Sequence, residues 1–169
     1  MTHHSDSGLL GALLEAWNRN NTILMNLLHV LPEGGLEAKA TPGSPSIAEL
    51  LTHIRFIRIC TVYENDPEFA RRHAELALQD EDEWLDERDP VRLAQMLQDS
   101  AGVVRDAVKG WVEAGRGRVG DYAHPVLLLQ HLLWHEGYHV GQMKLALKIT
   151  GRPLSDQEAG PATWNVWRH

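Results

Sequence analysis

The chain has 169 residues, of which 43% are hydrophobic and 23% charged, so it can form one globular domain with a sizeable core. Its net charge of −7 argues against nucleic-acid binding, which requires a basic surface. It lacks an apolar run near the ~20 residues that span a bilayer, and its polar start does not resemble a signal peptide. Its single cysteine excludes an internal disulfide. We therefore expect a cytoplasmic protein.

The first two predicted helices are separated by a loop rich in proline and glycine. Leucines recur at helical spacing over residues 8–30, and the loop at residues 32–45 ends that pattern. The second helix covers residues 46–64. It opens with a capping box, in which the side chains of Ser46 and Glu49 would accept hydrogen bonds from free backbone N–H groups.

A long acidic connection, residues 65–89, precedes the third predicted helix. It can include a short helix at about residues 68–77, and we expect its charge run, Asp80–Glu83, to be a solvated loop. The third helix covers residues 89–114, because Asp89-Pro90 supplies an N-cap followed by proline at the first helical position.

The fourth predicted helix covers residues 124–151 and ends at glycine and proline stop signals. The tail that follows, residues 152–169, carries Trp164 and Trp167, which we expect to fold back over apolar surface. Four long amphipathic helices without strands indicate an all-α protein. We expect a four-helix bundle with a long connection between its second and third helices.

A single domain over residues 1–169 accommodates all four predicted helices, with the helical core at about residues 8–151. The sequence shows no internal repeat and no low-complexity tract that would divide it. Any functional site should therefore lie within or beside this one helical core.

Three histidines in the last predicted helix, His131, His135 and His139, recur every four residues and so form one stripe. Lys144 and Lys148 fall on the opposite side of the helix, which predicts that the stripe faces the interior. Neutral imidazole is a good ligand for divalent metals. Three buried imidazoles are hard to explain otherwise, since each needs a polar partner. The pattern therefore predicts a metal site.

A catalytic metal site normally needs a third protein ligand besides a pair of neighbouring histidines. His53 is the natural candidate, because it lies midway along the second predicted helix beside an apolar stripe. His29, His73 and His124 suit the role less well, since they lie near a helix end, in the acidic connection and at a helix start. Considered alone, His53 is equally well explained as a hydrogen-bonded core residue.

The segment His135-Glu136-Gly-Tyr138-His139 also matches the H-E-x-x-H motif of zinc metalloproteases, whose glutamate is a general base. Those proteases have a third ligand downstream, where this chain has only His169, and an all-helical protein lacks an edge strand for a peptide. A protease is therefore the least favoured interpretation. Glu136 can orient a ligand imidazole or pair with a cation, and pairing is favoured. Glu136 and Tyr138 are also candidates for acid–base catalysis.

A histidine in the second predicted helix, then His135-x-x-x-His139 followed by Gly141-Gln142 in the last, resembles the DinB/YfiT-like superfamily of damage-inducible four-helix proteins. The resemblance covers essentially the whole chain. It implies a metal triad of His53, His135 and His139. We expect four further residues close to this triad, in its outer shell or lining its pocket: His131, Trp134, Tyr138 and Gln142.

The resemblance also implies a function. Members of the superfamily bind zinc, nickel or similar ions, and some act as metal-dependent hydrolases or as transferases that join a low-molecular-weight thiol to an electrophile. An enzyme with a divalent metal cofactor, a small-molecule substrate and a homodimeric state is therefore implied. The alternative is a non-catalytic metal-binding or stress-response protein, in which the ion stabilises the fold.

Overall fold

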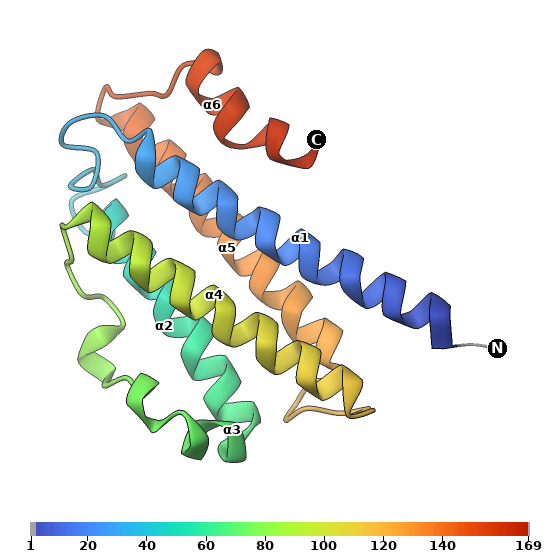
Figure 1. Ribbon diagram of the computed structural model, residues 1–169. Coiled ribbons are helices and arrows are strands. Elements are labelled where there is room, and N and C mark those ends of the chain that lie inside the picture. The colour runs from blue at the N-terminus through green and yellow to red at the C-terminus, as the bar shows by residue number, and fades with distance from the viewer. Residues whose placement is uncertain (1–2, 169) are drawn as a thin grey trace.

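Four long helices lie side by side and form the body of the molecule (Figure 1). The computed structural model describes residues 3–168, with side chains for residues 8–79 and 81–168. No strand occurs in this described part of the chain, so the predicted all-α class is confirmed. The long helices are α1 (His3–His29), α2 (Ile47–Asn65), α4 (Pro90–Glu113) and α5 (Pro125–Ile149).

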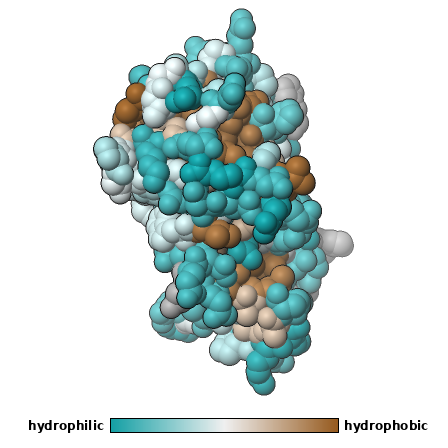
Figure 2. Space-filling view, turned by 90° about the vertical axis from the view of Figure 1, so that its left-hand side faces the viewer, coloured by the Kyte–Doolittle hydropathy of each residue, from teal (hydrophilic) through white to brown (hydrophobic). Residues whose placement is uncertain are grey.

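Short helical segments occupy the connection between α2 and α4 and the tail. The connection contains α3 (Pro67–Arg72) and the 3-10 helices η1 (Ala74–Leu76) and η2 (Asp80–Asp82). The tail contains α6 (Asp156–Ala162) and the 3-10 helix η3 (Trp164–Trp167). The side of the molecule at the left of Figure 1 is mainly hydrophilic, with separate hydrophobic patches (Figure 2). Among the described residues, no helix combines the length and apolar character needed to cross a membrane.

The helix ends follow local signals in the sequence. Ser46 and Glu49 form the predicted capping box of α2, in which each side chain accepts a hydrogen bond from the backbone N–H of the other residue. Asp89 caps α4 and His124 caps α5, each ahead of a proline at the first helical position. Gly151 follows α5 with a φ of 75°, which glycine adopts without strain.

The interior consists of two apolar clusters with a polar layer between them. Apolar side chains from all four long helices contribute to each cluster, and the aromatic ones lie in only one of them. Arg58 of α2 lies between the clusters and is fully buried. Its guanidinium donates hydrogen bonds to Glu136 of α5, Asn21 of α1, and both Ser100 and the Leu97 carbonyl of α4. The polar layer therefore joins the four long helices at one level.

The tail runs back along α1 (Figure 1). Arg19 of α1 donates a hydrogen bond to the Val166 carbonyl at 2.6 Å. The tail thus folds back as expected, but its indole rings do not lie buried on apolar surface, because Trp164 and Trp167 are 66% and 47% exposed. Hydrogen bonds to the tail backbone take the place of the indole burial that we expected.

Candidate metal site

Three histidines from two helices converge on one point. His53 lies in the middle of α2 and faces His135 and His139, which are one turn apart on α5. The Nε2 atom of His135 is 3.3 Å from Nε2 of His53 and 3.0 Å from Nε2 of His139. One potential ligand atom from each ring lies within 4.8 Å of the other two. The structure therefore brings together all three residues of the predicted triad.

The spacing and chemistry of these nitrogens fit a divalent ion. Tetrahedral zinc with Zn–N bonds of about 2.0–2.1 Å separates its ligand nitrogens by about 3.3 Å, close to the distances observed here. The rings cannot satisfy one another by hydrogen bonds alone. Nε2 of His135 contacts both neighbours, but a neutral ring nitrogen offers either one proton or one lone pair. A cation at the common point would accept a lone pair from each ring.

Gln142 fixes the orientation of His139. Its Oε1 atom accepts a hydrogen bond from Nδ1 of His139 at 2.6 Å, so the ring carries its proton there and Nε2 keeps a lone pair toward the cluster. The Gln142 amide in turn donates to the Tyr138 hydroxyl at 3.2 Å. Gln142 and Tyr138, both expected near the triad, therefore form a hydrogen-bonded chain that starts at one of its rings.

Burial keeps the three imidazoles neutral at physiological pH. His53 and His139 are only 7% and 6% exposed, and His135 is half-buried. Desolvation, reinforced by the neighbouring His139, lowers the pKa of His53 and of His135 to about 4. Desolvation also lowers the pKa of His139, although the hydrogen bond with Gln142 opposes it. Neutral imidazole is the form that binds a metal ion.

Glu136 belongs to the polar layer, although it lies between two histidines of the triad in sequence. It is fully buried, and Arg58 donates to its two oxygens at 2.6 and 2.8 Å, with Asn20 as a further donor. This is the pairing with a cation that the sequence analysis favoured. A carboxylate held by three donors is poorly placed to act as the general base of an H-E-x-x-H protease, because its lone pairs are already engaged.

The connection before α4 covers His53, and this contact was not expected from the sequence. Trp84 stacks on the His53 ring, with ring centroids 4.0 Å apart and planes 5° apart. Oε1 of Glu83 lies 3.2 Å from Nδ1 of His53, although out of line for a hydrogen bond. The run Asp80–Glu83, expected to be a solvated loop, thus ends in contact with the site. The tryptophan directly after the run is the only local signal of this contact, because a large indole gains by packing on a ring.

His131 and Trp134 lie at the surface beside the triad. His131 is exposed, and its Nδ1 pairs with the Tyr122 hydroxyl at 2.8 Å. The prediction that the whole histidine stripe faces the interior is therefore wrong for His131. Each step of four residues turns the helix face by about 40°, so the first histidine emerges toward solvent. Trp134 is 69% exposed and stacks on Tyr138, with ring centroids 6.2 Å apart.

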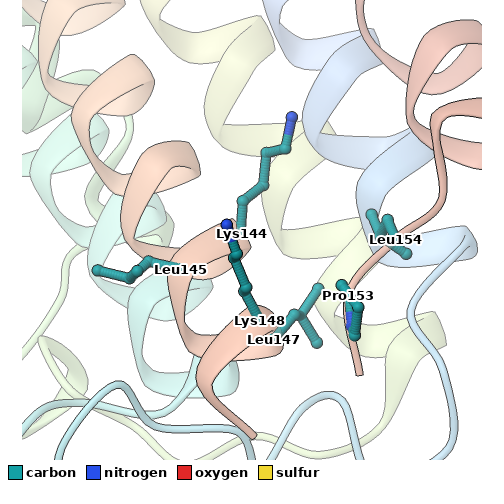
Figure 3. A pocket seen from close by; sticks show the side chains of 6 residues that line it. All are labelled: Lys144, Leu145, Leu147, Lys148, Pro153 and Leu154. Carbon is teal, nitrogen blue, oxygen red and sulfur yellow. The ribbon is translucent and has the colours of Figure 1, made fainter. Parts of the chain in front are cut away.

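A surface pocket of about 300 Å³ lies between the C-terminal part of α5 and the segment that follows it (Figure 3). None of the three converging histidines lines it. The candidate site is therefore identified by its donor atoms, since it does not coincide with this hollow. The pocket is lined by Lys144, Leu145, Leu147, Lys148, Pro153 and Leu154.

Comparison with known proteins places the chain in a family. A protein-family model described as the DinB family matches residues 1–158, a range that contains all four long helices and the beginning of α6. Neither the curated proteins nor the solved structures compared with the chain gave a match. Because the family model covers nearly the whole length, the chain belongs to the DinB family.

Proposed function

We propose that this protein binds one divalent metal ion through His53, His135 and His139. The convergence of three Nε2 atoms from two helices carries the proposal. Imidazole nitrogens suit zinc and nickel, and three ligands leave one position open in four-coordinate geometry. The proposal takes the chain to be a single cytoplasmic domain, a four-helix bundle of the DinB type, as the sequence led us to expect.

An open position favours an enzyme over a purely structural site. An ion held by three neutral ligands keeps its full charge and would lower the pKa of water or of a low-molecular-weight thiol bound to it. Gln142 would keep Nε2 of His139 directed at the ion. The Tyr138 hydroxyl accepts a hydrogen bond from Gln142 and retains its own proton to donate to a substrate. The proposed activity is that of a metal-dependent thiol transferase or hydrolase acting on a small electrophile.

A structural ion is the second candidate function. The burial of His53 and His139 favours it, because an ion between them would link α2 to α5 from within the protein. Closed metal sites stabilise folds without catalysis. In that case the protein would serve as a metal-binding or stress-response protein. The two candidates share the same ligands and differ in whether a substrate is converted.

Metal content tests the proposed triad. Metal-free wild-type protein reconstituted with zinc or nickel should hold one ion per chain by elemental analysis. His135→Ala should lose most of this metal, because it removes the ring that contacts both other ligands. His29→Ala is the matched control, since His29 is exposed at the end of α1, and it should retain the metal. Equal metal content in His135→Ala and the wild type would exclude the triad.

Turnover distinguishes the enzyme from the structural site. The metal-loaded protein is incubated with an electrophilic test substrate, either in water alone or with a panel of low-molecular-weight thiols. Loss of the electrophile that depends on both metal and thiol would identify a transferase, and loss that depends on metal alone would identify a hydrolase. Stoichiometric metal without conversion of any pair would favour the structural ion.

The proposal extends to a homodimer in which a second copy of the chain covers the outward side of α5. A helix that is apolar on both sides is normally buried on both. Successive outward residues are seven and four residues apart in turn, which keeps them on one side of the helix, and Leu127 and Ile149 each lie eleven residues from Tyr138. Such a stripe can pair with itself about a two-fold axis. This outer stripe consists of Leu127, Trp134, Tyr138, Leu145 and Ile149, which are 50–69% exposed.

A further inference from the structure

The connection between α2 and α4 contacts His53 of the triad through residues to which the proposed function assigns no role. We propose that Glu83 and Trp84 are positioning residues of the metal site, which hold His53 in place as a ligand and slow the release of the ion. The inference rests on the proposed metal site and adds a third structural element to α2 and α5.

Trp84 covers the open face of the His53 ring. The two rings are parallel within 5° and their centroids are 4.0 Å apart, so the indole limits rotation of the imidazole. Trp84 is 42% exposed whereas His53 is 7% exposed, which places the indole between the ligand and solvent. Stacking by Trp84 therefore opposes movement of the His53 ring away from the triad.

Glu83 supplies an acceptor for the outer nitrogen of His53. When Nε2 binds an ion, the neutral ring carries its proton on Nδ1, and that buried atom has no hydrogen-bond partner among the described side chains. Oε1 of Glu83 is only 3.2 Å away, and the side chain is 37% exposed, so it has room to rotate into line. A carboxylate on the outer nitrogen fixes the ring orientation and strengthens the ligand. Gln142 already occupies the equivalent position on His139.

The backbone beside Trp84 is attached to α2 independently of the imidazole. The hydroxyl of Thr52, a fully buried residue, donates to the Leu85 carbonyl at 2.8 Å. The connection thus contacts Thr52 and His53 of α2 through three consecutive residues, Glu83, Trp84 and Leu85. This docking holds the carboxylate and the indole at the ligand, which a freely solvated acidic loop would not do.

Zinc affinity and zinc release test the inference on the full-length protein. Affinity is measured by competition with a chelator, and release by adding excess chelator to the loaded protein. Glu83→Ala should bind zinc about 10- to 100-fold more weakly than the wild type, and Glu83→Gln, which keeps an acceptor, should recover part of the loss. Trp84→Ala should release zinc about tenfold faster. Trp84→Phe should release zinc at nearly the wild-type rate, because a phenyl ring can still stack.

Glu81→Ala is the matched control, because it removes an exposed carboxylate from the same acidic run, and it should bind zinc as the wild type does. Thermal unfolding of each metal-free variant separates a loss of packing from a loss of ligand positioning. If Glu83→Ala and Trp84→Ala only lower metal-free stability, with zinc affinity and release equal to those of Glu81→Ala, the inference is wrong and the triad stands. Wild-type protein that binds no zinc would overturn both this inference and the proposed metal triad.

Discussion

Each imidazole of the triad has two nitrogens, and the partner of the outer one decides what the inner one presents to the cluster. His139 donates a hydrogen bond from Nδ1 to Gln142, so its inner nitrogen, Nε2, carries a lone pair directed toward the cluster. Among the described residues, Nδ1 of His53 and Nδ1 of His135 are buried without a hydrogen-bond partner, although Oε1 of Glu83 lies 3.2 Å from the former. His139 is thus the proposed ligand whose orientation is best defined before any ion binds.

Replacing Gln142 should therefore weaken metal binding. In Gln142→Leu the Nδ1–H of His139 loses its acceptor and the ring is free to change tautomer, so zinc affinity should fall about 10- to 100-fold in a chelator competition. Gln142→Glu restores an acceptor and should bind more tightly than Gln142→Leu. Gln130→Leu, at an exposed position of the same helix, serves as the control. Equal affinities of Gln142→Leu and Gln130→Leu would show that the hydrogen bond does not orient the ligand.

The triad could be predicted from the sequence because helical spacing alone places His135 and His139 on one side of a helix. The same reasoning placed His53 beside the apolar stripe of another helix. It could not find Glu83 and Trp84, because their contact with His53 depends on the path of an irregular connection, which has no periodicity to read. Local pattern thus identified the histidines proposed as ligands, with the family resemblance completing the set, while the residues that cover them depend on tertiary structure.

Among the helices, the ion pair Arg58–Glu136 links α2 to α5 near the histidine triad. Arg58 follows His53 by five residues, and Glu136 lies between the two histidines of α5. A buried ion pair adds little net stability over apolar side chains of similar size, but any other alignment of the helices would leave a charge unpaired. We infer that this ion pair sets the alignment of α2 against α5 at which the three imidazoles meet.

Removing one partner of this ion pair should lower the stability far more than replacing both partners with apolar residues. Arg58→Met alone leaves the Glu136 carboxylate buried and unpaired, and should lower the free energy of unfolding of the metal-free protein by about 3–5 kcal/mol, measured by urea denaturation. Adding Glu136→Leu should recover most of that loss. Lys109→Ala, which breaks an exposed ion pair with Glu113, should change stability by less than about 1 kcal/mol. A double variant no more stable than Arg58→Met would contradict this account.

Helix ends were predictable where the signal is local. Ser46 with Glu49, and Asp89 with the proline after it, satisfy backbone groups within one turn, so α2 and α4 begin within one residue of the predicted positions. The start of α1 has no such signal, and the helix begins at His3, five residues before the predicted start.

The role of Arg58 was not predicted, although it shares a helix face with apolar residues, since its partners lie on three other helices.

For the molecule as a whole, the two sides of α5 differ in composition. Its inward side carries His135, Glu136 and His139, whereas its outward side carries the outer stripe. A surface helix of a monomer usually presents polar residues to solvent, and a contiguous apolar stripe marks an interaction site. Tyr138 belongs to the stripe and is also hydrogen-bonded to Gln142, so a second copy at this stripe would lie next to the proposed metal site of the first.

A charge in the outer stripe should therefore separate the copies. In sedimentation equilibrium the wild type should have twice the 19.0-kDa mass of one chain. Leu145→Glu should be monomeric, because pairing the stripe would bury an uncompensated carboxylate. Val91→Glu adds the same charge at a residue of α4 that is 75% exposed, and it should remain dimeric. A monomeric wild type at all concentrations, or a Leu145→Glu variant that dimerises as well as Val91→Glu, would place the partner of α5 elsewhere.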